Sequence, residues 1–200
     1  MKNFNLKFIL ALGTIVACQS AFATVITFES LGSGGTNSNS VADGYTESGY
    51  QFNNLNHVGD AVAFAVWQTG NTNDFNGSTA LFNNYDSGQT EMTQVGGGGF
   101  NVTSIDMSCL YLNNPGAFSV SFTGTRADAS TVTNTFTLNT PNSVQTFNFS
   151  GMSNVVKLDW TQSSPYHQFD NININTVPEP ASLAVLGLGA FALIRRRKNS

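Results

Sequence analysis

The sequence FSVSFTG, residues 118–124, alternates between apolar and hydroxyl-bearing side chains. Phe118, Val120 and Phe122 fall on one face of an extended strand and the hydroxyls on the other, because successive side chains point to opposite faces. Comparable short segments recur at residues 24–29, 49–53, 60–67, 100–112, 131–138, 144–149, 155–160 and 169–174. About nine short strands without helical periodicity predict an all-β fold, a two-sheet antiparallel sandwich of the jelly-roll type.

The charge distribution limits the partners of this domain. Only 10% of the 200 residues are charged, and between Thr24 and Val177 just Arg126 and Lys157 are basic. Eleven acidic residues lie in the same segment. Nucleic acid is therefore excluded, because a phosphate backbone requires a cationic face. A divalent cation or a neutral polar ligand fits this composition better.

The N-terminus has the pattern of an export signal. Lys2 and Lys7 flank an apolar run at residues 8–17, and Ala21-Phe22-Ala23 supplies the small residues that signal peptidase requires. The sequence predicts a signal peptide at residues 1–23. The alternative to cleavage after Ala23 is lipidation of Cys18, which lies in a loose lipobox at residues 15–18. Cys109 is then the one remaining cysteine, and its strand pattern indicates a small buried side chain.

The C-terminus has the pattern of a short membrane segment. Apolar residues at 181–194 precede a cationic cluster of Arg195, Arg196, Arg197 and Lys198. Fourteen residues rise about 21 Å as a helix, short of a hydrocarbon core of roughly 30 Å. We expect a marginal transmembrane helix whose basic end stays in the cytoplasm.

Pro178-Glu179-Pro180, the glycine-containing apolar span and the arginine cluster together resemble the PEP-CTERM sorting signal, a segment also labelled ice-binding protein C-terminal domain. The resemblance implies recognition by an exosortase at residues 177–200 and removal of the tail. It also implies an inner-membrane-anchored precursor that is delivered to the cell surface or extracellular matrix, beside exopolysaccharide. Signal peptidase and, transiently, the membrane are the further partners that it implies.

Residues 24–176 also resemble the β-domain that often precedes this signal. The likeness is carried by ITFE at 26–29, ADGY at 42–45, GYQF at 49–52, NGSTALFN at 76–83 and FDNI at 169–172. It implies a jelly roll similar to non-catalytic carbohydrate-binding modules.

Asp170 is the candidate metal ligand. It alternates with Ile172 and Ile174, so the strand pattern turns its carboxylate inward, where an unpaired charge is costly. First and last strands often pair in sandwiches, which would bring Glu29 near Asp170. The sequence predicts a structural calcium ion held by these two residues. A carboxylate that accepts backbone N–H bonds in a turn is the alternative.

Three aromatic residues are the candidate ligand contacts. Trp67 shares a strand face with small alanines and could stack on a sugar ring, although a strand covered on both faces would look the same. Tyr45 and Tyr50 lie near turns, where sugar sites often form.

No catalytic motif is present, so the expected function is non-enzymatic. The sequence favours an exported glycan-binding module associated with exopolysaccharide. A structural matrix protein without a selective ligand is the alternative. A glycoside hydrolase, or an ice-binding surface on the threonine ladder of residues 131, 133, 135 and 137, is less favoured.

Overall fold

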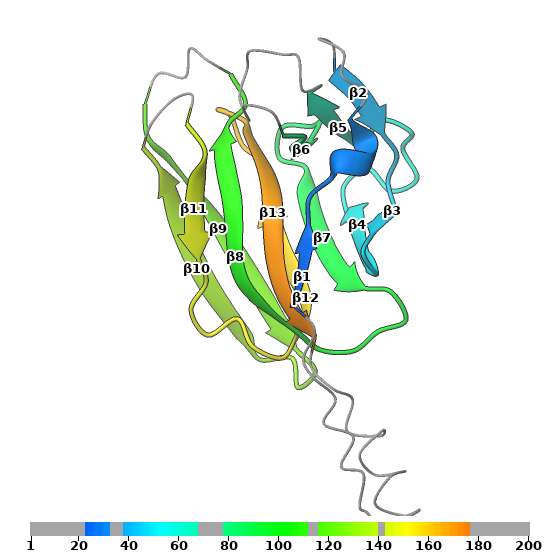
Figure 1. Ribbon diagram of the computed structural model, residues 1–200, viewed down its shortest axis with the longest axis vertical. Helices are drawn as coiled ribbons and strands as arrows, with labels where there is room; N and C mark the ends of the chain where they lie inside the picture. Colours follow the sequence, from blue (N-terminus) through cyan, green and yellow to red (C-terminus); the bar gives the residue numbers. More distant parts are fainter. Residues whose placement is uncertain (1–22, 33–37, 68–77, 112–115, 140–142, 177–200) are drawn as a thin grey trace, which may run out of the picture.

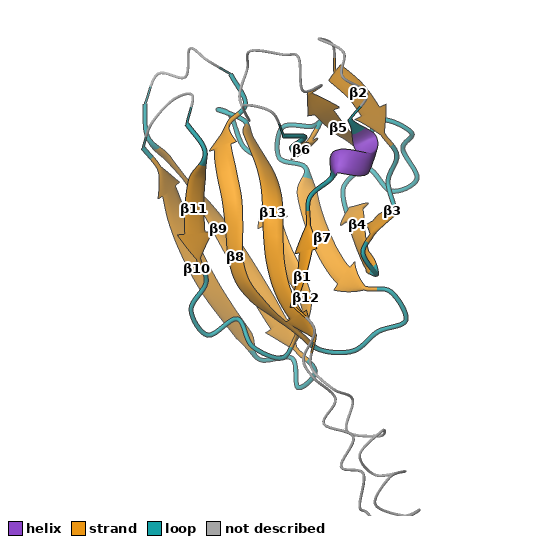
Figure 2. Ribbon diagram, viewed as in Figure 1, coloured by secondary structure: helices purple, strands orange, loops and turns teal. Residues whose placement is uncertain are grey.

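The computed structural model describes residues 23–32, 38–67, 78–111, 116–139 and 143–176. These residues form thirteen strands and one short 3-10 helix, η1 (Glu29–Leu31). Figures 1 and 2 show the strands arranged in two layers. Every described strand pair is antiparallel, which confirms the expected all-β sandwich.

The first layer, called here the β13 sheet, is built around the last strand. It contains β11 (Gln145–Asn148), β8 (Phe100–Cys109) and β13 (His167–Thr176). The edge of β13 opposite β8 pairs with both β1 (Ala23–Ile26) and β6 (Leu81–Asn83). Strand β6 also pairs with β5 (Phe64–Trp67), and β5 pairs with β2 (Ser38–Val41). The last strand therefore has β8 on one side and the beginning of the chain on the other.

The second layer is called the β12 sheet. In spatial order it contains β10 (Thr131–Leu138), β9 (Phe118–Arg126), β12 (Val155–Thr161), β7 (Gln89–Gln94), β4 (Tyr50–Asn54) and β3 (Tyr45–Glu47). A single described pair, Val155 with Phe100, joins the two layers. The two sheets are thus almost separate, and the edge strands of the β12 sheet are β10 and β3.

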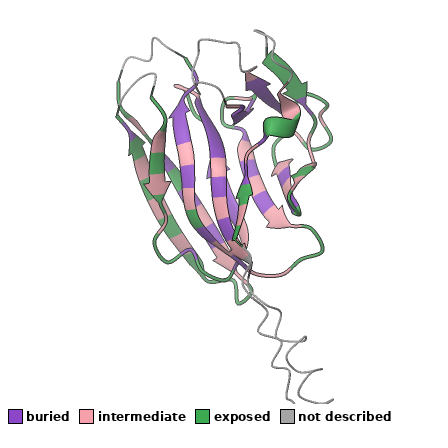
Figure 3. Cartoon of the chain, in the orientation of Figure 1, coloured by how far each residue is buried: buried purple, intermediate pink, exposed green. Residues whose placement is uncertain are grey.

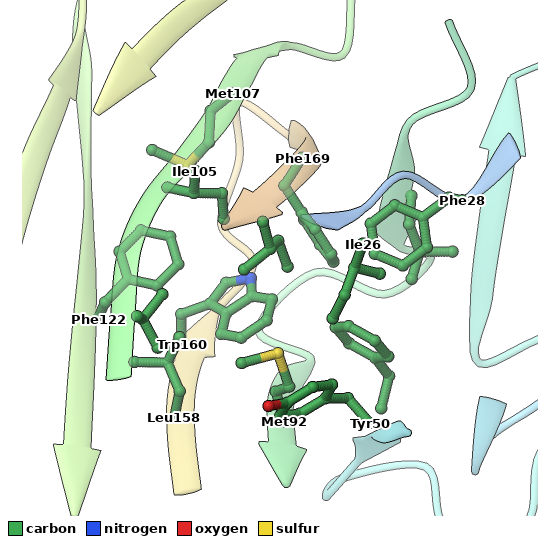
Figure 4. Close-up of a cluster of buried hydrophobic side chains, with 14 of the residues drawn as sticks. Ile26, Phe28, Tyr50, Met92, Ile105, Met107, Phe122, Leu158, Trp160 and Phe169 are labelled. Carbon is green, nitrogen blue, oxygen red and sulfur yellow. The ribbon is translucent and has the colours of Figure 1, made fainter. Parts of the chain in front are cut away.

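The core lies between the sheets, where alternate residues of both layers meet (Figure 3). Trp160 of β12 packs edge-on against Phe169 of β13, with ring centroids 4.9 Å apart. Figure 4 shows these two side chains with Phe122, Met107 and Ile26 in one apolar cluster. Removing such aromatic surface from water is the main stabilising contribution to the fold. Cys109 is buried, as its strand pattern predicts.

Apart from Ala23, which begins β1, the predicted tails lie outside the described residues. These are the signal peptide, Cys18 and the sorting segment with Pro178, Glu179, Pro180 and Arg195 to Arg197. Within the described part of the chain, no helix has the length and hydropathy needed to cross a membrane.

Candidate functional site

Glu29 is held at a sharp bend after the first strand. Phe28 adopts the left-handed conformation, with φ of 55°, and its side chain is fully buried. The Glu47 carboxylate accepts the backbone N–H groups of Thr27 and Phe28, both at 3.1 Å. This bend ends β1 and projects Glu29 from the first position of η1.

The segment before β6 binds the Glu29 carboxylate. Oε1 accepts hydrogen bonds from Ser78 Oγ at 2.7 Å and from the Thr79 backbone N–H at 3.0 Å. Gly32 makes this approach possible, because a Cβ at Gly32 would lie 2.4 Å from Thr79 Oγ1. Residues 29–32 therefore wrap closely around buried Thr79.

The same Ser78 hydroxyl reaches the carboxylate of Asp170. Ser78 Oγ lies 2.5 Å from Asp170 Oδ2, so a single hydroxyl touches both predicted metal ligands. The structure thus brings Glu29 and Asp170 together, although they are far apart in sequence. We name Glu29, Ser78, Asp106 and Asp170 the Asp170 cluster.

Asp170 is fully buried, as expected, but the predicted face is wrong. Its register partner on β8 is Asp106, while the preceding pair, Phe169 with Met107, points into the core. Asn171 adopts a φ of 46° where the register shifts, so the alternation breaks before Ile172. Asp170 therefore lies on the outer face of the β13 sheet, beside Asp106.

The electrostatics of the cluster are dominated by burial. Loss of solvent raises the pKa of Asp170 to about 7, and the nearby charges of Glu29 and Asp106 act in the same direction. The Ser78 hydrogen bond and the Asn171 backbone N–H lower the pKa and only partly compensate. Asp106 itself is bound, accepting hydrogen bonds from Thr146 at 2.6 Å and Asn171 at 2.9 Å.

The two basic residues of the domain, Lys157 and Arg126, are bonded elsewhere and do not neutralise this cluster. Lys157 Nζ lies 3.3 Å from Glu91 and 3.1 Å from Asp159, on the β12 sheet. Arg126 donates to the backbone carbonyls of Ser153 and Gly151. Within the described part of the chain, the Asp170 cluster therefore holds three carboxyl groups without a cationic side chain beside them.

The three predicted ligand contacts do not form one site. Tyr50 is 1% exposed and packs edge-on against Phe100, so it offers no ring face to a ligand. The Tyr45 hydroxyl donates to Glu47 at 2.6 Å, and its ring lies against Phe28 and Phe52. Both residues belong to the β12 sheet, away from Trp67 on β5.

Trp67 belongs to a second apolar cluster with Ala65, Phe82 and Leu110. Its ring is stacked near Phe82, with centroids 6.1 Å apart, and it is only partly buried. Strand β5 is therefore covered on both faces, and the alternative interpretation of its sequence pattern holds for Phe64, Ala65 and Val66.

An exposed aromatic pair lies beside this second cluster: Tyr166, which the sequence places near a turn, and Tyr111, which was not among the predicted ligand contacts. Tyr111 is 51% exposed, and its ring centroid is 6.3 Å from that of Tyr166. Tyr166 packs against the same cluster as Trp67. Burial and then the charge of Asp86 raise the pKa of Tyr166, which places the Asp86 carboxylate near this ring. We name Trp67, Asp86, Tyr111 and Tyr166 the Tyr111 site.

Backbone register creates the pair. The Leu110 N–H donates to the Tyr166 carbonyl at 2.8 Å, immediately beyond the pairing of Cys109 with His167. Tyrosines 55 positions apart in sequence are thus brought to one end of the β13 sheet. The sequence signal available for each residue was only a tyrosine next to a strand end.

Comparisons with solved structures return carbohydrate-binding modules and an adhesin domain. A family 29 carbohydrate-binding module has 13% identity and a TM-score of 0.43, covering 82% of this chain and 97% of that chain. A variant of CBM29-2 complexed with mannohexaose has 13% identity and a TM-score of 0.43, covering 78% and 92%. The K1 cleaved adhesin domain of Lys-gingipain from Porphyromonas gingivalis W83 has 9% identity and a TM-score of 0.49, covering 78% and 99%.

No curated protein matches the chain. At the C-terminus, residues 176–198 match the family model of the PEP-CTERM protein-sorting motif. This match contains the Pro178-Glu179-Pro180 sequence and the arginine cluster. The chain therefore carries a PEP-CTERM sorting motif, which marks it as an exported protein made as a membrane-anchored precursor.

Proposed function

We propose that this chain is a non-catalytic module that binds neutral polysaccharide at the cell surface or in the extracellular matrix, through the Tyr111 site. The observation that carries the proposal is the exposure of Tyr111. Among the described phenylalanine, tyrosine and tryptophan residues it is the one exposed side chain, with 51% of its surface accessible to solvent. An aromatic ring left in water beside a second tyrosine suits a ligand with apolar faces and polar edges.

The surroundings match the chemistry of a sugar. Tyrosine rings stack on the C–H face of a pyranose, and the Asp86 carboxylate accepts hydrogen bonds from hydroxyl groups. A sugar polymer that bears carboxylate or sulfate would be repelled by the acidic domain, whose two basic residues are engaged elsewhere. This charge balance favours a neutral glycan.

The route outward follows from the sorting motif. We expect signal peptidase to act at the N-terminus and an exosortase to act near Pro178 to Pro180. The arginines at 195–197 would hold the tail on the cytoplasmic side until processing. The polysaccharide of the extracellular matrix is then the ligand that the released domain meets.

The test is a glycan array probed with the full-length chain in mild detergent, followed by titration with the best glycan. We expect Tyr111→Ala to weaken binding at least about fivefold, because an aromatic stacking contact contributes about 1–3 kcal/mol. Tyr111→Phe, which retains the ring, should keep most of the affinity. Val58→Ala, which changes another exposed apolar residue, should have no effect.

Absence of any selective glycan signal would overturn this proposal and favour a structural matrix protein. One observation supports that second candidate. Within the described residues, β10 pairs with β9 alone, so its other edge is open to a second chain. Concentration-dependent assembly in light scattering, without glycan binding, would identify the matrix role.

A further inference from the structure

We propose that the Asp170 cluster binds one calcium ion, with the carboxylates of Asp170 and Glu29 as its protein anchors. The inference is independent of glycan binding. It starts from a buried atom: Asp170 is 0% exposed, and its Oδ1 accepts no hydrogen bond from the described residues. A buried carboxylate oxygen without a partner is costly, and a bound cation removes that cost.

The geometry around Ser78 gives the second argument. Its hydroxyl lies within hydrogen-bond distance of both Glu29 Oε1 and Asp170 Oδ2, but it has one proton to donate. Two ionised carboxylates cannot both be satisfied by that proton. Either one carboxyl group is protonated or a positive charge lies close to the pair.

The described residues do not provide that positive charge. Asp106, the register partner of Asp170, adds a third carboxylate to the same face of the sheet. Lys157 is engaged with Asp159 and Glu91, and Arg126 with backbone carbonyls. An external cation is therefore the available means of neutralising this cluster while Asp170 and Glu29 both stay ionised.

The ligand set selects calcium. Among the described residues, no three side chains of the His, Cys, Asp and Glu types lie together as a complete metal site. The shell would be completed by hydroxyl, backbone carbonyl or water oxygens, which calcium accepts in irregular geometry at 2.3–2.6 Å. Magnesium requires a small octahedral shell, and zinc prefers nitrogen and sulfur. The low number of carboxylates predicts an affinity in the range of extracellular modules, about 10⁻⁴–10⁻³ M.

The ion would join three segments that are distant in the chain. Glu29 follows β1, Ser78 precedes β6, and Asp170 lies within β13, and β1 and β6 pair with the same edge of β13. Calcium at this position would fix the beginning of the chain to its last strand. Its removal should therefore lower the global stability of the sandwich.

The experiment measures thermal unfolding of the full-length chain in mild detergent after chelation, during titration with calcium chloride. We expect the midpoint to rise by about 5–10 °C when free calcium exceeds its Kd a hundredfold. Equilibrium dialysis with labelled calcium should find one ion per chain. Magnesium at the same concentration should give a smaller shift.

Two variants test the assignment. Asp170→Asn should abolish the calcium response, and Glu29→Gln, which changes a more exposed residue, should weaken it even if the first variant folds poorly. Asp128→Asn, at a turn between β9 and β10, should respond like the original chain. An unchanged midpoint together with no bound calcium would overturn the proposal and identify a protonated Asp170. An equal response to magnesium would overturn the choice of calcium.

Discussion

Two nearly buried aspartates on the outer faces of the two sheets are neutralised in different ways. Asp159 on the β12 sheet is 9% exposed, and Lys157 lies 3.1 Å from its carboxylate, bridging it to Glu91. Asp170 on the β13 sheet is 0% exposed, and its charged neighbours among the described residues are the carboxylates of Glu29 and Asp106. One sheet thus carries its own counter-ion, and the other depends on a proton or an ion from solution.

Removing the lysine should have the largest effect. Lys157→Met leaves Asp159 and Glu91 opposite one another without a cation. We expect the free energy of unfolding to decrease by about 2–3 kcal/mol. This loss is smaller than the roughly 3–5 kcal/mol expected when a fully buried ion pair is broken, because the lysine side chain is 36% exposed. Denaturant titration measures this loss.

The double variant with Asp159→Asn is the control for the lysine experiment. It should recover part of the stability, because the buried charge is gone. A single Lys157→Met variant as stable as the original chain would contradict the pairing. The two sheets would then not differ in their dependence on a lysine.

Acid should test the β13 sheet through His167. Complete burial lowers the pKa of His167 to about 3, and its Nδ1 has no hydrogen-bond partner in the described residues. Below pH 6.5 His167 binds a proton in the unfolded chain but stays neutral in the folded chain. The free energy of unfolding therefore decreases as the pH is lowered from 6.5 to about 3. The expected slope is about 1.4 kcal/mol per pH unit.

His167→Leu removes this titration. Denaturant titrations at pH 7 and pH 5 should therefore show a smaller loss for the variant than for the original chain. Equal losses in the two proteins would mean that His167 is not the group responsible. The comparison between the two proteins isolates His167 from the carboxylates that titrate in the same range.

The smallest expected effect concerns the support of Glu29. In Gly32→Ala, the new Cβ would overlap Thr79 Oγ1, and the hydroxyl and residues 29–32 must shift. We expect a cost of about 1 kcal/mol and a weaker calcium response. Gly116→Ala, where no atom lies within 4 Å of the new Cβ, is the matched control.

A normal calcium response in Gly32→Ala would separate the position of Glu29 from calcium binding. The same variant should leave the coupling of Lys157 to Asp159 unchanged, because that pair lies on the other sheet. A double-mutant cycle between Lys157 and Asp159 in the Gly32→Ala background measures this coupling.

The sequence predicted the longer strands whose hydropathy alternates, and it missed the shortest strands and the polar strand β7. Residues 131–138 were expected as a strand and form β10 with the same bounds. By contrast β6 is Leu-Phe-Asn, three buried residues, and β3 is Tyr-Thr-Glu. Such short elements show no measurable period, and tertiary pairing determines them.

The candidate sites were predicted in part for a related reason. The proximity of Glu29 to Asp170 followed from expecting the first and last strands to pair, and β1 does pair with β13. The sheet face on which Asp170 lies could not be predicted from the sequence, because the left-handed Asn171 interrupts the alternation of the strand. The Tyr111 site depends on the register between β8 and β13, which no local pattern encodes.

The pairing of β1 with β13 also determines how the domain is presented. Ala23 is opposite Asn175, so the first and last described strands have their outer ends at the same pole of the sandwich. Tyr111 lies beyond the opposite end of β8, a strand of ten residues that is about 30 Å long. A membrane tether attached after Thr176 would therefore hold the domain by one pole, leave the aromatic pole directed outward, and allow release by one cut without opening either sheet.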